Sequence, residues 1–250
     1  MLNNKNKIQL YHGDCLELMK NIPDKSIDMV LCDLPYGTTW SKWDNIIDFD
    51  MLWEEYNRIC KKAVVLFSTQ PFTTNLINSN IKNYKYTWYW VKNIKGNYLN
   101  AKKQPLRQLE EINVFNKHNY SPQGIKKCNK ISIRGSATKI SMQNYENKWL
   151  QKSEGYPSNV LYYSLDKEHL HPTQKPVALL EYLIKTYTNE GEMVLDNCMG
   201  SGSTGVACIN TNRNFIGIEK DDKYFDIAVN RIENHIKENN LGNIELSINK

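Results

Sequence analysis

The feature that most constrains the fold of this chain is a glycine-rich turn near its C-terminal end. An apolar run over residues 193–195 ends in Asp196, the turn follows, and small residues that favour a helix come next. Three glycines there have the G-x-G-x-x-G spacing: Gly200, Gly202 and Gly205. Such glycines permit a tight turn and let a ligand lie against bare backbone at a helix N-terminus. A second apolar run, residues 214–218, ends in Glu219, so the sequence predicts a β-α-β unit with an acid at each strand tip.

The acid beside the turn indicates which ligand the turn holds. A carboxylate at Asp196 would repel a pyrophosphate, which disfavours a nicotinamide dehydrogenase, whereas it suits a ligand with a cationic amine. S-adenosylmethionine has an ammonium group and no phosphate, and Glu219 is placed to accept hydrogen bonds from its ribose hydroxyls. We therefore expect S-adenosylmethionine as the cofactor. The alternative without a ligand is a glycine turn that only packs a helix on a sheet.

The charge of the chain is unevenly distributed. The formal net charge is +5, but residues 82–152 contain 15 basic and 3 acidic side chains, a net charge of +12, which leaves −7 for the remainder. A solvated surface normally mixes both signs, so a one-sided block of this size indicates a polyanionic partner such as nucleic acid. A lysine-rich surface without a partner is the alternative.

Composition and cysteine spacing narrow the class of protein. With 250 residues, 40% of them hydrophobic and 24% charged, the chain suits one soluble core with a small insertion. No apolar run approaches the roughly 20 residues that span a membrane, and no signal-type apolar core follows the N-terminus. We therefore expect a cytoplasmic protein without a membrane partner. The six cysteines lack C-x-x-C spacing, and no cluster completes a site with His169 and His171, so we expect free thiols and no metal.

A buried-type strand over residues 27–32 leads into a short motif, Asp33-Leu34-Pro35-Tyr36, with specific chemistry. The amino group of a nucleobase is a poor nucleophile because its lone pair is delocalised into the ring. Attack on a methyl sulfonium therefore needs acceptors aimed at the amino hydrogens, and the Asp33 carboxylate and the Leu34 carbonyl can supply them. Pro35 stiffens the turn, and Tyr36 can stack on the base. An ordinary Pro-Tyr turn at a strand end is the structural alternative.

Other residues have both a structural and a functional interpretation. Asp14 follows a predicted strand, where it either faces the adenine of the cofactor or caps the next helix. Trp40 and Trp43 in a polar loop either close over a flipped base or anchor the loop. Three aromatic residues share one face of a predicted strand: Tyr86, Trp88 and Trp90. This stripe is more typical of core packing than of a base-stacking platform. Thr173 and Lys175, at the start of a predicted helix, can hold the carboxylate of the cofactor.

Together these motifs resemble the permuted group of DNA amino-methyltransferases, in which the order is catalytic motif, target-recognition region, cofactor motif. The resemblance rests on residues 33–36, 171–176 and 196–202 and covers most of the chain. It implies a Rossmann-like α/β methyltransferase fold with a mostly parallel seven-stranded sheet, and a target base swung out of the duplex. The core would comprise residues 1–119 and 170–250, with a basic target-recognition insertion at 120–169.

By position, the resemblance implies a catalytic motif at Asp33, Leu34, Pro35 and Tyr36. The cofactor contacts that it implies are Thr173, Lys175, Asp196, Gly200, Gly202 and Glu219. Two departures stand out. Leu34 occupies a position that is usually proline, and Asn197-Cys198 replaces the commoner Pro-Phe after the cofactor acid. The first departure keeps the required backbone carbonyl, whereas the second changes residues that shape the glycine turn.

An aspartate at the first position of the catalytic motif is commoner in the adenine enzymes of this group. We therefore expect an enzyme that methylates adenine in double-stranded DNA. A cytosine-N4 methyltransferase of the same fold is the nearest alternative, followed by an RNA or protein glutamine methyltransferase and by a non-catalytic DNA-binding module. The sequence leaves open the recognition sequence, whether the chain forms a homodimer, and whether a separate restriction endonuclease is its partner.

Overall fold

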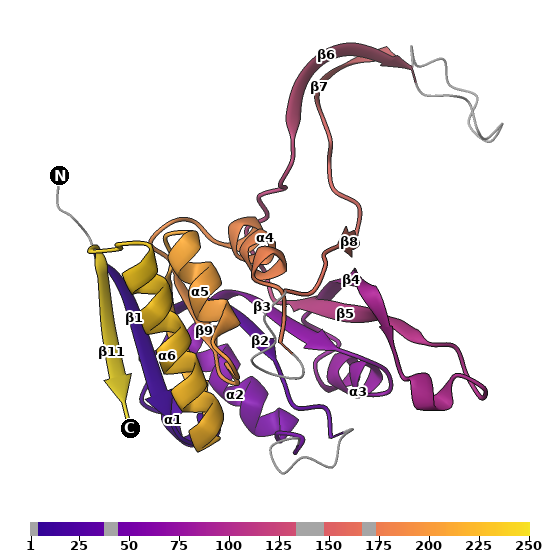
Figure 1. Ribbon diagram of the computed structural model, residues 1–250. Coiled ribbons are helices and arrows are strands. Elements are labelled where there is room, and N and C mark those ends of the chain that lie inside the picture. Colours follow the sequence, from indigo (N-terminus) through magenta and orange to yellow (C-terminus); the bar gives the residue numbers. More distant parts are fainter. Residues whose placement is uncertain (1–4, 38–44, 134–147, 167–173) are drawn as a thin grey trace. The chain divides into compact units, whose positions relative to one another are not determined.

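The computed structural model describes residues 5–37, 45–133, 148–166 and 174–250 (Figure 1). The chain divides into two compact units. The larger unit comprises residues 1–121 and 159–250, and the smaller one residues 122–158. The expected insertion at 120–169 thus contains the smaller unit, but its last residues, from 159 onward, belong to the larger one. No helix among the described residues is long and apolar enough to cross a membrane.

The larger unit is built on one mostly parallel sheet, which confirms the α/β fold class. Its strands are β1 (Asn6–His12), β2 (Ile27–Asp33), β3 (Cys60–Ser68), β4 (Tyr84–Gly96), β5 (Arg107–Phe115), β8 (Val160–Tyr162), β9 (Met193–Asp196), β10 (Asn214–Glu219) and β11 (Ile244–Asn249). Their order across the sheet is β11-β1-β10-β9-β2-β3-β5-β4-β8. Only β5, among these nine, runs antiparallel to its neighbours.

The expected number of seven strands was too low, because β8 and β11 extend the sheet at its two edges. Strand β8 has three residues, too few for a periodic pattern to stand out. Strand β11 does show the apolar and polar alternation of a half-buried strand through Ile244, Leu246 and Ile248, and it pairs parallel to β1.

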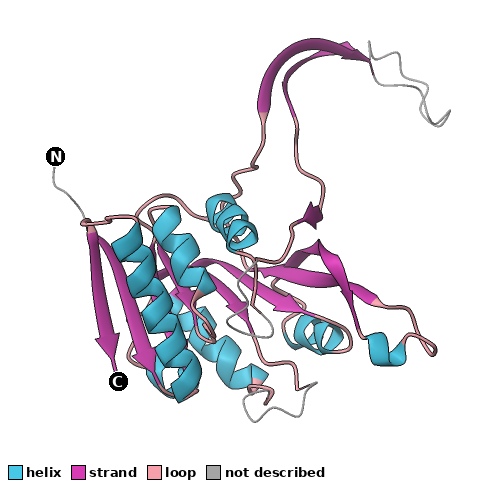
Figure 2. Ribbon diagram, viewed as in Figure 1, coloured by secondary structure: helices cyan, strands magenta, loops and turns pink. Residues whose placement is uncertain are grey.

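Helices cover both faces of the sheet, giving three layers (Figure 2). The helices are α1 (Cys15–Met19), α2 (Phe49–Ile59), α3 (Phe72–Ser79), α4 (Val177–Tyr187), α5 (Ser203–Asn210) and α6 (Asp222–Glu238), and a 3-10 turn, η1, spans Tyr98–Asn100. Helices α1, α2 and α3 pack into one hydrophobic cluster, and α4, α5 and α6 into the other. Alternate residues of the strands enter the two clusters, so the sheet is buried on both sides, as a parallel sheet requires.

The aromatic stripe of β4 belongs to the core, as its spacing predicted. Trp88 and Trp90 are 3% and 1% exposed. Their indole N–H groups find partners inside the protein, because Trp88 Nε1 donates to the Tyr187 hydroxyl at 2.6 Å and Trp90 Nε1 to the Tyr163 carbonyl at 2.9 Å. Buried indoles with satisfied N–H groups stabilise a core and leave no face for base stacking.

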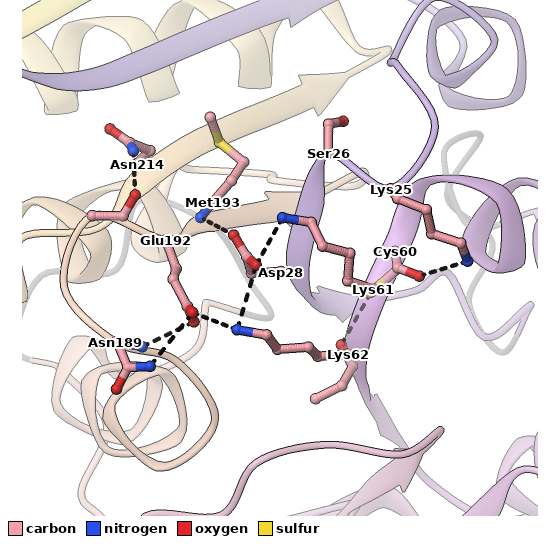
Figure 3. A network of polar contacts seen from close by, with 12 residues as sticks. Lys25, Ser26, Asp28, Cys60, Lys61, Lys62, Asn189, Glu192, Met193 and Asn214 are labelled. Carbon is pink, nitrogen blue, oxygen red and sulfur yellow. Dashed lines mark hydrogen bonds and ion pairs between the residues drawn. The ribbon is translucent and has the colours of Figure 1, made fainter.

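A polar network joins the two halves of the chain at the amino ends of β2 and β9 (Figure 3). The Asp28 carboxylate accepts a hydrogen bond from the Met193 backbone N–H at 3.0 Å and forms an ion pair with Lys61 Nζ at 3.0 Å. Lys62 lies 3.5 Å from Asp28 and also pairs with Glu192. Register pairs between β2 and β9 are few, so these contacts reinforce the join between the halves.

The smaller unit is an antiparallel hairpin of β6 (Lys126–Ile133) and β7 (Lys148–Glu154). Residues 122–158 contain seven basic and two acidic side chains. The cross-strand pair Ile131 and Leu150 is exposed, at 74% and 51%. A basic ribbon with exposed apolar side chains lacks a core of its own, which is typical of a surface that contacts another molecule.

Candidate active site

The candidate site lies at the carboxyl edge of the sheet, where the topology collects the tips of β2, β9 and β10. Parallel strands end at the same edge, so Asp33, Asp196 and Glu219, far apart in sequence, come together there. They line a single cavity of about 560 Å³. The predicted residues that line it are Asp14, Asp33, Leu34, Pro35, Tyr36, Lys175, Asp196, Gly200 and Glu219.

The glycine turn forms the floor between β9 and α5. Gly200 and Gly202 have φ angles of +50° and +77°, in the left-handed region that favours glycine. Gly202 lies outside the cavity lining and stands at the N-cap of α5, where an added Cβ would come within 3.1 Å of Ala228. Its structural task is therefore close packing against α6, and a contact to the cofactor stays a prediction.

The unusual Asn197-Cys198 pair fixes the same turn in its own way. Asn197 is 2% exposed, and its Oδ1 accepts a hydrogen bond of 2.6 Å from the Tyr56 hydroxyl of α2. The Cys198 backbone N–H donates to Asp196 Oδ1 at 3.2 Å. A buried polar anchor thus holds the turn at the positions where the resemblance implies that proline and phenylalanine are commoner.

Asp196 is a buried residue of the cavity wall. It is 4% exposed, and its Oδ2 accepts a hydrogen bond of 2.6 Å from Thr204 Oγ1. Burial raises the pKa of Asp196 to about 6, although the hydrogen bonds from Thr204 and Cys198 oppose the shift. The carboxylate is therefore ionised at neutral pH but held at a cost in free energy, and a cationic ligand would relieve that cost.

Glu219, at the tip of β10, is oriented by three backbone amides. Its Oε2 accepts from Gly200 N–H at 2.9 Å, and its Oε1 accepts from Lys220 and Asp221 N–H, each at 2.9 Å. Burial raises the pKa of Glu219 while these amides oppose the shift. Both oxygens keep lone pairs for further donors, which suits an acid that receives two ribose hydroxyls.

Asp14 takes the capping role and also lines the cavity. Its Oδ1 accepts from the Leu16 backbone N–H of α1 at 3.0 Å, and its Oδ2 pairs with Lys220 Nζ at 3.0 Å. Burial acts to raise the pKa of Asp14, but Lys220 and the amide of Leu16 outweigh it and hold the pKa below its ordinary value. The two interpretations of Asp14 are thus compatible, and its contact with adenine stays a prediction.

The catalytic motif follows β2 directly. The Tyr36 hydroxyl donates to Asp33 Oδ1 at 2.5 Å, and the Tyr36 ring lies 5.0 Å from that of Phe72, centroid to centroid. Leu34 is 3% exposed and packs into the cluster under α2 and α3. Leucine thus anchors the motif by burial of its side chain, at the position where proline is more usual.

Lys175 lines the cavity, and its ammonium group contacts two acids. Its Nζ donates to Asp33 Oδ2, lies 3.4 Å from Glu110 Oε2, and sits 5.2 Å from the centroid of the Phe67 ring. Glu110 Oε1 in turn accepts from Lys92 Nζ at 2.6 Å. In this arrangement the ammonium group is paired with Asp33, and its contact with the cofactor carboxylate stays a prediction.

Sequence reasoning missed Glu110 and Lys92, since neither belongs to a motif. The only signal was an acid beside a buried-type strand and a lysine in a basic connection. Predictions for Thr173, Trp40, Trp43, His169 and His171 concern positions outside the described residues.

The residues of the cavity fit S-adenosylmethionine. The volume lies within the range of small-molecule sites, which is roughly 300–1,000 Å³. The acids of the wall include Asp14, Asp196 and Glu219, and bare backbone is offered at Gly200. This set suits one ammonium group and vicinal hydroxyls, and it has the wrong charge for a phosphate.

Comparison with known proteins places the chain in a family. Residues 27–230 match the DNA methylase family, so the chain belongs to it. The DNA adenine methyltransferase YhdJ of Escherichia coli (strain K12) is 29% identical, over 90% of this chain and 82% of its own length. The type II methyltransferase M.HinfI of Haemophilus influenzae is 26% identical, over 88% of this chain and 67% of its own length.

Solved structures agree with this assignment. M1.HpyAVI in complex with SAM superposes with a TM-score of 0.60 at 27% identity, over 90% of this chain and 99% of that one. The cytosine-N4-specific PvuII DNA methyltransferase has a TM-score of 0.62 over 98% of both chains, at 17% identity, which shows a shared fold. The protein is therefore a DNA methyltransferase of the N6/N4 family.

Proposed function

We propose that the protein transfers a methyl group from S-adenosylmethionine to the N6 amino group of adenine in double-stranded DNA, after the base has left the duplex. The observation that carries this proposal is the position of Asp33. Its carboxylate lies in the same cavity as Asp196 and Glu219, so the acceptor for an amino group and the candidate cofactor contacts share one space. The adenine methyltransferase named among the relatives supports the choice of base.

The residues of the catalytic motif have distinct tasks. When bound, S-adenosylmethionine supplies a methyl group on a cationic sulfur. Asp33 accepts a hydrogen bond from the base amino group, which localises the nitrogen lone pair, and takes the proton that this nitrogen loses. The backbone carbonyl of Leu34 accepts a hydrogen bond from the second amino hydrogen. Tyr36 holds Asp33 through its hydroxyl, and its ring stacks on the base.

Extrusion of the base follows from the depth of the acceptor. Asp33 is at the end of a central strand, and its side chain is 21% exposed. An amino group inside a base-paired stack cannot come within hydrogen-bond distance of such a group, so the nucleotide has to rotate out of the duplex.

Basic surfaces in both units support a nucleic-acid substrate. In the larger unit, residues 92–107, from the last part of β4 to the first residue of β5, contain five basic and no acidic side chains. Strand β4 runs in the same direction as β3, so this tip leaves the sheet at the edge that carries the cavity. Tyr98 and Leu99 at the tip are 65% and fully exposed. The hairpin β6–β7 adds a second basic surface, and a two-stranded ribbon is narrow enough for the major groove.

The test is to incubate purified protein with S-adenosylmethionine and unmethylated bacterial DNA, digest the DNA, and identify the nucleosides by mass spectrometry. We expect N6-methyladenine, and none with Asp33→Ala. Methylcytosine alone would replace adenine by cytosine-N4 as the target. No methylated nucleoside, with cofactor binding demonstrated by calorimetry, would contradict a DNA substrate.

A further inference from the structure

Four charged side chains from four separate segments form one chain of contacts beside the cavity. Asp33 ends β2, Lys175 precedes α4, Glu110 is on β5 and Lys92 is on β4. Lys175 and Glu110 are 7% and 9% exposed, so their charges depend on each other and on protein groups.

Both oxygens of Asp33 are engaged in this structure. Tyr36 donates to Oδ1 and Lys175 to Oδ2, so an incoming amino group competes with these donors for the lone pairs of Asp33. Lys175 already has a second carboxylate 3.4 Å away, at Glu110 Oε2. A shift of roughly half an ångström would turn that contact into a charge-assisted hydrogen bond of about 2.8 Å. Lys92 Nζ donates a hydrogen bond of 2.6 Å to the other oxygen of Glu110, Oε1, which holds the Glu110 carboxylate in place.

We propose that Glu110 is a positioning residue, which holds the Lys175 ammonium group beside Asp33 and receives it when the base amino group binds to Asp33 Oδ2. This inference rests on the proposed role of Asp33 as the acceptor. The handover keeps the buried ammonium group paired throughout, and it frees the oxygen only when a donor arrives to replace it. A lone Lys175–Asp33 pair would instead compete with the substrate.

The charges around Asp33 give this role a signature in pH dependence. Burial raises the pKa of Asp33, Lys175 opposes the shift, and Glu110 adds to it. The other titratable groups near Asp33 are Tyr36, Cys32 and Asp196. The acid limb of the rate profile should follow Asp33, since only the ionised carboxylate accepts the amino hydrogen.

The experiment measures single-turnover methyl transfer against pH, with DNA and S-adenosylmethionine saturating. Glu110→Gln should move the acid limb to lower pH and reduce the plateau about tenfold, because Lys175 then stays on Asp33. Lys175→Met should move the limb to higher pH. In the Lys175→Met background, Glu110→Gln should cause no further loss of the plateau, because Glu110 acts through Lys175.

The matched control is Glu111→Gln, the next residue of β5, which accepts a hydrogen bond from Thr73 instead. It should leave the limb in place. Equal losses of rate in Glu110→Gln and Lys175→Met without opposite shifts of the limb would overturn the positioning role. Absence of methyl transfer by the unaltered enzyme would instead contradict the proposed function.

Discussion

Strand β2 carries an aspartate near each end, and the two have opposite electrostatic character. Asp28 joins the network at the amino edge, with Lys61, Lys62 and the backbone of Met193. Burial acts to raise its pKa, but the Met193 amide and the two lysines outweigh it, so the pKa lies below its ordinary value. At the carboxyl edge, burial raises the pKa of Asp33 in spite of Lys175.

The difference indicates that the network at the amino edge stabilises the fold, whereas the one at the carboxyl edge leaves a carboxylate reactive. Both networks connect the first part of the chain to the second, across β2 and its neighbours. The carboxylate of Asp28 is satisfied by partners of opposite charge and a backbone donor, which is the arrangement of a structural clamp. The negative charge of Glu110 acts on Asp33 and partly offsets the effect of Lys175. The charge of Asp33 is therefore incompletely compensated, and the carboxylate can interact with a substrate.

Loss of Asp33 should have the largest effect. We expect Asp33→Ala to lower the single-turnover rate by about a thousandfold, because the amino group loses its charged acceptor. Its affinity for S-adenosylmethionine should stay within about threefold, since the acids at Asp196 and Glu219 are unchanged. Calorimetry and quenched-flow transfer assays measure the two quantities. Wild-type turnover in this variant would contradict the assigned mechanism.

Loss of Asp28 should affect stability and leave catalysis intact. Asp28→Ala leaves the Met193 N–H without its acceptor and removes a carboxylate from Lys61 and Lys62. We expect the free energy of unfolding to fall by about 2–3 kcal/mol. Denaturant titration at pH 7 measures this loss.

The pH dependence of that loss has a definite sign. Because folding lowers the pKa of Asp28, its stabilisation is fully present above the unfolded value of about 3.8 and disappears as pH falls through the folded value. The difference between wild type and Asp28→Ala should therefore shrink in strong acid. An Asp28→Ala variant that keeps its stability but loses methyl transfer would reverse the roles assigned to the two edges of the sheet.

Asp196 allows a sharper test at the carboxyl edge. Its pKa is raised to about 6, so in the free protein it becomes neutral below that pH. If it attracts the cofactor ammonium, affinity should fall by up to about tenfold per pH unit below 6. Asp196→Asn should flatten this dependence between pH 5 and 7. Calorimetric titration measures both curves, and a flat wild-type curve would exclude Asp196 as the charge partner.

Much of this site was predictable because its signals are local. A strand, a glycine turn and a helix occupy residues 193–210 without interruption, and the acids at strand tips converge by the rule that parallel strands end at one edge. The motif at residues 33–36 could be singled out for the same reason, since the chemical task proposed for it falls on four consecutive residues.

The partners of these residues were not predictable, because they come from distant segments. Glu110 is one of two consecutive acids on β5 that belong to no motif, and only the antiparallel insertion of β5 beside β3 brings it near Asp33. Lys175 has a local helix-start signal, but its ion pair depends on tertiary packing. Gly202 shows the reverse case, in which a motif position serves packing against Ala228.

Asp14 should give the smallest effect and can separate its two tasks. Asp14→Ser keeps a side-chain acceptor for the Leu16 N–H but removes the charge that pairs with Lys220. The ion pair is largely exposed, so stability should change by less than about 0.5 kcal/mol. Asp14→Ala, which also loses the cap, should cost about 1 kcal/mol. If Asp14 only caps α1, both variants bind S-adenosylmethionine like wild type. Weaker binding by the serine variant at unchanged stability would instead indicate that the carboxylate contacts the adenine of the cofactor, and would add a fourth functional acid to the carboxyl edge.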